Sequence, residues 1–215
     1  MNLFKTLALT SVFALGFGAA AQAVTVDNGS IVGNSLEEGS TESADVLLIR
    51  ENTGVETTEV VLVDYLFGTN LEVGTGVTGI NTATTSLELG AGTYNSYLLH
   101  YDPAGADSTS QEITLADNES IVALIVSNNG LGGLLNLSQD PFGLAGITYA
   151  DEIGRRTEDN DFITLTSVNS ILFNTATNSR NIDNVRVITQ VVPLPAGAAL
   201  LLTGLVAFGA VRRKG

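Results

Sequence analysis

The chain lacks cysteine and tryptophan altogether, and it has a single histidine. Without cysteine it can form no disulfide and offers no thiol nucleophile. One histidine excludes a His-rich zinc site within a monomer. The G-x-S-x-G elbow of many serine hydrolases is absent too, which argues against that class of enzyme. Stability must therefore come from an ordinary hydrophobic core, for which a body of this length is sufficient.

Positive charge is scarce between the two termini. Four of the nine basic residues lie near the ends of the chain, whereas all 23 acidic residues lie between positions 24 and 192. This body therefore has five cations, all arginine, and a net charge of about −18. Such a charge repels phosphate backbones and anionic bilayers, so it disfavours nucleic acid as a partner and leaves cations and neutral glycans.

The N-terminus has the pattern of a secretory signal peptide over residues 1–23. Lys5 is the only charge in this segment, and residues 7–17 are mostly apolar. The segment ends in Ala-Gln-Ala, the small-x-small form of a signal-peptidase site. The predicted cleavage site is therefore made of Ala21, Ala23 and Val24.

The C-terminal residues 191–215 have the features of a membrane-inserted sorting tail. Sixteen uncharged residues, 196–211, would rise about 24 Å as a helix, against a hydrocarbon core of about 30 Å. Two prolines before this span favour extended backbone at the membrane surface. Basic residues after the span favour a cytoplasmic C-terminus, which leaves the body on the outer side. These membrane-flanking residues are Arg212, Arg213 and Lys214.

A five-residue motif precedes the span: Val192, Pro193, Leu194, Pro195 and Ala196. With the span and the basic end, it resembles the VPLPA-CTERM signal of bacterial surface proteins, a relative of the PEP-CTERM class. The resemblance implies cleavage by an exosortase-type membrane enzyme and a role linked to extracellular polysaccharide and biofilm matrix. Residues 97–189 are similar to a domain type common among exosortase-sorted proteins, which implies a β-rich build. A permanent membrane anchor without processing is the alternative.

The body, residues 24–190, is predicted to be one all-β domain. Short runs of β-branched and aromatic residues are bounded by Gly, Asn, Asp or Ser, and few stretches repeat every 3.6 residues. The pattern predicts a single antiparallel β-sandwich, similar to a jelly roll. The expected strands are 44–49, 59–66, 94–101, 112–115, 121–126, 162–166, 170–173 and 185–191.

Three local patterns carry further expectations. The six apolar residues 121–126 indicate a strand that is covered on both faces. The sequence Asn52-Thr53-Gly54 is typical of a hairpin connection. The glycine-rich segment 68–79 and the segment 136–161 are predicted to be long loops, where binding sites usually lie.

Side chains that could act chemically are most concentrated in residues 97–103, which contain the only histidine of the chain. Alternation along a strand places His100 and Asp102 on one face and Tyr101 on the other. A histidine beside an aspartate can act as a base, a metal ligand or a pH-sensitive contact. A histidine capped at a strand end is the interpretation that we favour, with a ligand contact as the alternative.

Two adjacent cations, Arg155 and Arg156, precede an acidic cluster. They are expected to anchor a loop through carboxylates, or else to contact a glycan or uronate, with a tyrosine as the stacking face. No cofactor is required, but acidic loops offer the hard oxygen ligands that calcium prefers, although no EF-hand is complete. The ligand candidates are His100, Tyr101, Arg155 and Arg156, and the calcium candidates are Asp102, Asp107, Asp159 and Asp161.

The sequence thus predicts a non-enzymatic, exported protein of a Gram-negative surface, anchored in the inner membrane before processing and then displayed or released. Its expected partners are signal peptidase, an exosortase-type enzyme, the membrane before processing, and extracellular polysaccharide. Two alternatives stay open. One is a secreted carbohydrate-active hydrolase that uses paired carboxylates. The other is a calcium-stabilised structural module.

Overall fold

The computed structural model describes residues 25–26, 35–36, 39, 41–78, 87–126, 141–149, 161–177 and 182–192. Every helix or strand assigned in these ranges is a strand, so this part of the protein is all-β. The strands are β1 (Thr25–Val26), β2 (Ser35–Leu36), β3 (Leu47–Thr57), β4 (Val61–Val63), β5 (Tyr65–Leu66), β6 (Gly76–Thr78), β7 (Leu87–Leu89), β8 (Gly92–Tyr101), β9 (Asp107–Thr114), β10 (Glu119–Val126), β11 (Thr148–Tyr149), β12 (Phe162–Ser167), β13 (Ser170–Thr177) and β14 (Asp183–Val191).

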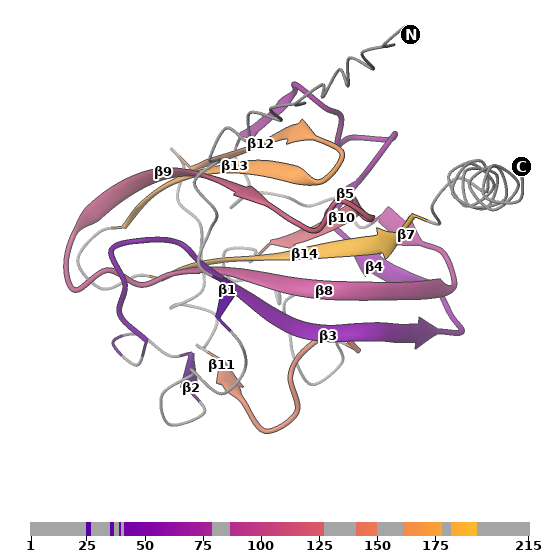
Figure 1. Cartoon of the computed structure of the whole chain (residues 1–215), viewed down its shortest axis with the longest axis horizontal. Helices are drawn as coiled ribbons and strands as arrows, with labels where there is room; N and C mark the ends of the chain where they lie inside the picture. Colours follow the sequence, from indigo (N-terminus) through magenta and orange to yellow (C-terminus); the bar gives the residue numbers. More distant parts are fainter. Residues whose placement is uncertain are drawn as a thin grey trace, which may run out of the picture.

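The largest sheet has six strands in the order β1-β3-β8-β14-β10-β5 (Figure 1). Its pairings are antiparallel, except that β1 lies parallel to β3 at Leu48 and Ile49. The strands β8, β14 and β10 form its centre. Because they are rich in valine, isoleucine, leucine and tyrosine, they suit a pleated surface that is largely buried.

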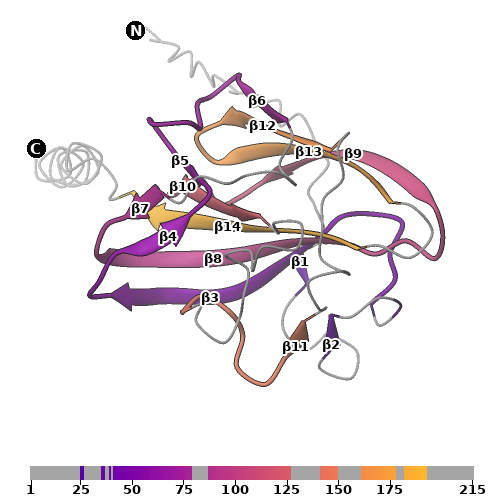
Figure 2. The ribbon, with the colours of Figure 1, turned by 180° about the vertical axis from the view of Figure 1, so that it is seen from behind.

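A second sheet has four antiparallel strands in the order β6-β12-β13-β9. Figure 2 shows β9 curving along the outer rim of this sheet, beyond β13. Along β12 and β13, buried residues alternate with partly or fully exposed ones, as expected for a sheet that faces the core on one side. The inward side chains are Ile163, Leu165, Ile171 and Phe173.

The two sheets share one hydrophobic cluster, which we call the inner core. Its side chains come from both sheets, so burial of this cluster holds one sheet against the other. The six-stranded sheet contributes, among others, Leu48, Tyr97, Leu99, Leu124 and Val187. The four-stranded sheet contributes Ile113 and the four inward residues of β12 and β13.

The opposite face of the six-stranded sheet carries a second cluster, the outer core. It is covered by the short parallel pair β2–β11, by the antiparallel pair β4–β7, and by residues 141–149. From the sheet come Ile49, Leu98, Ala123, Ile125 and Ile188, and from the cover come Leu36, Val63, Leu89, Phe142 and Tyr149. The prediction that residues 121–126 form a strand covered on both faces is therefore confirmed.

Each of the eight expected runs overlaps a strand, but two local predictions are wrong. Asn52-Thr53-Gly54 is not a hairpin connection, because it lies inside β3. There the register with β8 shifts twice, and Gly54 takes a φ of +67°, which an L side chain rarely adopts. The segment 68–79 is not wholly loop, because it contains β6 and the fully buried Leu71.

The ends of the described fold lie close to the predicted processing sites. β1 begins at Thr25, and β14 runs to Val191, one residue beyond the expected limit of the body at 190. Among the residues that the structure describes, no helix is long and apolar enough to cross a membrane. The predicted span, the basic end and the signal cleavage site lie outside those residues.

Candidate functional site

The end of β8 and the start of β9 bring several of the predicted site residues together. The faces alternate as expected, since Tyr97, Leu99 and Tyr101 belong to the inner core while Leu98 belongs to the outer core. His100 and Asp102 follow Leu98 onto that second face. The neighbouring residues His100 and Tyr101 therefore have separate environments.

His100 is fully buried and pairs with the strand beside it. Its Nδ1 lies 2.8 Å from Oδ1 of Asn184, the residue opposite it on β14. Burial lowers the pKa of His100 to about 4, although the bond to Asn184 acts in the other direction. The ring is therefore neutral at physiological pH and has no surface for a substrate. Within the described residues, its Nε2 has no hydrogen-bond partner.

Tyr101 is buried on the other face, and carboxylates surround its hydroxyl group. Burial raises the pKa of Tyr101 to about 12, and the negative charges of Asp107, Asp183 and Asp45 add to the shift. Asp183 in turn accepts a hydrogen bond from the hydroxyl of Thr175. The ring is 0% exposed, so it offers no stacking face for a sugar in this structure.

Asp102 fastens a neighbouring segment to the end of β8. Its Oδ2 accepts a hydrogen bond from the backbone N–H of Gly39 at 2.8 Å, and its carbonyl oxygen accepts one from Ser43 N–H at 2.7 Å. The side chain is 2% exposed. These contacts give Asp102 a structural role in positioning Gly39 and Ser43.

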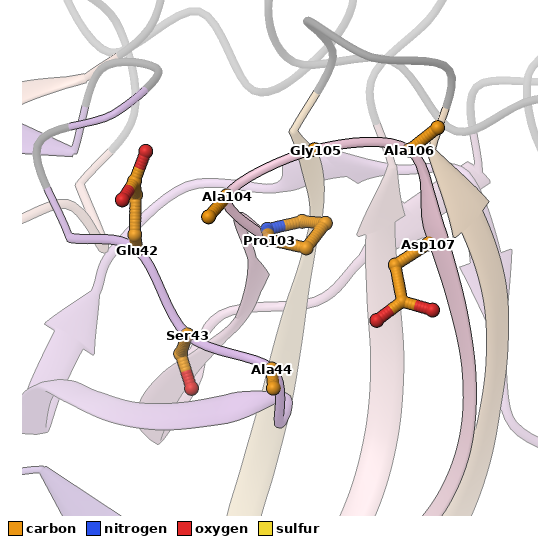
Figure 3. Close-up of a pocket in the computed structure, with 8 residues that line it drawn as sticks. All are labelled: Glu42, Ser43, Ala44, Pro103, Ala104, Gly105, Ala106 and Asp107. Carbon is orange, nitrogen blue, oxygen red and sulfur yellow. The ribbon is translucent and has the colours of Figure 1, made fainter.

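A shallow hollow of about 380 Å³ lies beside these residues. It is open to solvent and lies between residues 42–44 and the 103–106 loop, which joins β8 to β9. Figure 3 shows that the carboxyl groups of Glu42 and Asp107 stand on opposite sides of the hollow and do not point toward each other. The hollow can accept water or a small polar group, but it does not present a facing pair of carboxylates.

The predicted calcium residues are only partly brought together. Asp107 is exposed at the hollow, whereas Asp102 and Asp161 are buried, and Asp159 lies outside the described residues. Within the described ranges, no group of three or more acidic or histidine side chains could hold a metal ion. Arg155 and Arg156 also lie outside those ranges. The calcium and glycan contacts therefore stay predictions.

The sequence reasoning missed a buried ion pair on the outer-core face. Arg186 Nε lies 2.6 Å from Oε2 of Glu51, and its Nη2 lies 2.7 Å from Oε1, with both side chains fully buried. Tyr149 donates its hydroxyl to the same carboxylate, and its ring lies 5.9 Å from the guanidinium carbon. The bidentate pair joins Arg186 of β14 to Glu51 of β3, and Tyr149 joins β11 to the same carboxylate.

A second buried carboxylate lies on the inner-core face. Glu119 Oε1 accepts hydrogen bonds from Asn95 Nδ2 at 2.9 Å and from Tyr97 Oη at 2.8 Å, and its Oε2 accepts one from Thr189 Oγ1 at 2.9 Å. Each buried acid is thus matched by donors from neighbouring strands. Local sequence carried little signal for either network. Glu51 follows Arg50, Glu119 lies between Asn118 and Ser120, and Val-Arg-Val-Ile places a charge in an apolar strand without showing that it is buried.

No protein-family model, no curated protein and no solved structure matches this chain.

Proposed function

We propose that this chain is an exported surface or extracellular-matrix protein, processed at both ends and acting without catalysis as an adhesive or polysaccharide-associated module. The observation that carries the proposal is that the last described strand ends where the predicted motif begins in the sequence. β14 ends at Val191, and Val192, the first residue of the motif, is 47% exposed. The last backbone hydrogen bond in the described residues runs from Val192 N–H to the Asn118 carbonyl, at 2.8 Å. Pro193 has no N–H with which to continue the pairing.

The N-terminal end supports the same arrangement. β1 begins at Thr25, two residues after the predicted signal-peptidase site at Ala23. Cleavage there would leave β1 free to pair with Leu48 and Ile49 of β3. Both predicted cleavages would therefore spare the strands, as export of an intact folded domain requires.

We further propose that the two sheets form a jelly-roll-like sandwich that serves as a binding or matrix-forming scaffold. The inaccessible histidine supports a role without acid–base catalysis by that residue. The buried carboxylates Glu51 and Glu119 are engaged with donors inside the sheets. The body, residues 24–192, carries a net charge of about −18, which suits a neutral polysaccharide better than an anionic one.

Substitution of the motif prolines tests this proposal. Pro193→Ala together with Pro195→Ala should leave an unprocessed, membrane-bound form, because a sorting enzyme would lose the extended segment that it recognises. The chain has two other prolines, and the double variant Pro103→Ala and Pro141→Ala is the matched control, which should be processed normally. Membrane fractionation followed by mass measurement reads the result. Equal recovery of mature protein from the motif variant would refute recognition of the motif.

Two assays separate the proposal from its rivals. Binding to polysaccharide without turnover supports it, whereas release of reducing ends that is lost on substitution of one Asp or Glu would establish a hydrolase. A melting temperature that falls on chelation would favour the calcium-stabilised module.

A further inference from the structure

The outer edge of β9 is the longest regular strand edge that the described part of the protein leaves open. β9 is the last strand of its sheet, and it pairs with β13 over eight consecutive residues without a register shift. The edge strands β1 and β5 have two residues each, and β6 has three. The outer side of β3 is also open beyond Ile49, but two register shifts interrupt it. Among the strands that the structure describes, β9 alone therefore offers a continuous row of backbone donors and acceptors.

The direction of the backbone groups in β9 can be read from one contact. The N–H of Ser108 donates to Oδ1 of its neighbour Asp107 at 2.8 Å, and so it points away from β13. Because backbone direction alternates along a strand, the even-numbered residues present their N–H and C=O groups to the outer edge. The side chains of these residues are all exposed and polar: Ser108, Ser110, Glu112 and Thr114.

The chemistry of this edge favours another copy of the same strand over an apolar peptide. The only buried apolar side chain of β9, Ile113, belongs to the inner core and is closed to a partner. An incoming strand would find hydroxyl groups and one carboxylate beside the open backbone. The sheet already pairs such groups across its strands, since Thr114 Oγ1 lies 2.9 Å from Ser170 Oγ, and Thr166 Oγ1 donates to Glu112 Oε1 at 2.6 Å.

We propose that two copies of the protein associate through antiparallel pairing of their β9 strands. In an antiparallel pair, a residue whose backbone groups point toward the partner strand lies opposite another such residue. Under twofold symmetry the axis therefore passes through a residue of β9 and not between two residues. An axis at Ser110 places Glu112 opposite Ser108, and an axis at Gln111 places Glu112 opposite Ser110. Both registers place the Glu112 carboxylate opposite a serine hydroxyl and keep the acidic residues of the two copies apart. The like-charge repulsion that usually protects an exposed edge strand from pairing is therefore absent.

The net charge of the chain sets the conditions for this association. Two copies that each carry a net charge of −14 repel each other at long range. Salt screens that repulsion, because the Debye length falls from about 30 Å at about 0.01 M to about 10 Å at about 0.1 M. Short contacts across the strand pair are affected less. We therefore expect the dimer to become tighter as salt rises within this range.

Sedimentation of the full chain in a neutral, density-matched detergent tests the pairing and does not depend on whether the termini are processed. Ser110→Asp places a new carboxylate against its twofold mate or against Glu112, and it should weaken the dimer at least about tenfold. Ser110→Ala, the matched control, keeps the backbone donor and should stay within about threefold. Ser110 is exposed, so neither substitution should change the melting temperature.

The substitution Ser110→Lys distinguishes between the two registers. It should tighten the dimer if the axis lies at Gln111, where the ammonium group meets Glu112, and weaken it if the axis lies at Ser110, where two ammonium groups meet. A chain that remains monomeric throughout the salt series would overturn the proposal. So would a dimer that is indifferent to both the Asp and the Lys substitution.

Discussion

The two main sheets of this protein are built from similar residues but differ in how many faces they bury. The six-stranded sheet has a core on each side, and seven of the nine residues of its central strand β14 are buried. The four-stranded sheet has a core on one side, and β9 at its edge buries one residue of eight. One sheet therefore supplies stability, and the other supplies polar surface.

The doubly covered sheet also encloses charged groups, whereas the exposed sheet displays them. Glu51 and Arg186 are fully buried on the outer-core face, and Glu119 is nearly buried on the inner-core face. Glu112 on β9 is exposed and accepts a hydrogen bond from the hydroxyl group of Thr166. Removal of one partner from a buried pair costs more than removal of an exposed carboxylate, because the remaining charge is left without compensation in a low dielectric.

The largest expected effect comes from breaking the buried pair. Glu51→Ala should lower the free energy of unfolding by about 3 to 5 kcal/mol. Glu112→Ala is the matched control on the exposed sheet and should cost about 0.5 kcal/mol or less. Urea unfolding followed by tyrosine fluorescence measures both, since the chain has no tryptophan. Equal costs for the two variants would show that the sheets do not differ as described.

An apolar pair of substitutions sharpens the same comparison. Leu98→Ala removes a fully buried side chain from the centre of the six-stranded sheet and should cost about 3 kcal/mol. Leu172→Ala acts on the solvent side of β13, where the leucine is partly exposed, and should cost about 1 kcal/mol. If Leu172→Ala proves as costly as Leu98→Ala, the four-stranded sheet must have a second covered face.

A further effect, which depends on pH, is expected at the junction of β4 and β5. Burial raises the pKa of Asp64 to about 7 from 3.8, although the Val126 N–H, 2.7 Å from its Oδ2, opposes the shift. Between pH 3.8 and about pH 7, the Asp64 carboxyl group binds its proton more tightly in the folded state than in the unfolded state. The contribution of Asp64 to stability is therefore present at acid pH and is lost as pH rises through about 7.

Asp64→Asn should cancel this loss, because the amide keeps an oxygen for Val126 and carries no charge. The variant should exceed the original protein in stability by about 4 kcal/mol above neutral pH, because each unit of the pKa shift corresponds to about 1.4 kcal/mol, and the two should match at acid pH. His100 has the opposite sign, since its pKa is lowered to about 4 and its contribution falls as pH drops from 6.5. This contribution of His100 is the same in the variant and in the original protein, so it cancels in the difference between their stabilities. A stability difference that does not depend on pH would contradict the assignment to Asp64.

The sequence was sufficient for the longer strands and for the faces of Tyr97 to Tyr101 on β8, but not for the short strands β1, β2, β6, β7 and β11. Side chains of a strand alternate between its two faces, which assigned the residues at the end of β8 to their faces, and the apolar run of β10 correctly indicated two covered faces. The bulge in β3 escaped prediction because Asn-Thr-Gly satisfies the local rules of a turn, while the long-range pairing with β8 keeps the chain extended. β6 and Leu71 escaped for a similar reason, since their glycine-rich surroundings conceal the pairing of β6 with β12 and the burial of Leu71 in the inner core.

The candidate site was only partly predictable. Local sequence indicated a histidine held at the end of a strand, but its partner Asn184 lies 84 residues away and becomes visible only once β8 and β14 are paired. The ion pair between Glu51 and Arg186 spans 135 residues. Charge counting identified Arg186 as one of five body cations, but no local pattern shows that it is buried.

Intact mass and terminal sequencing of the protein recovered from its native envelope and medium test the account most directly. β14 is a central strand of the doubly covered sheet, so cleavage must fall after Val191 if the fold is to survive. The account predicts a product that starts at Val24 and ends near the proline motif. A chain that retains Arg212 to Gly215 would contradict it, and so would a stable product that ends within β14.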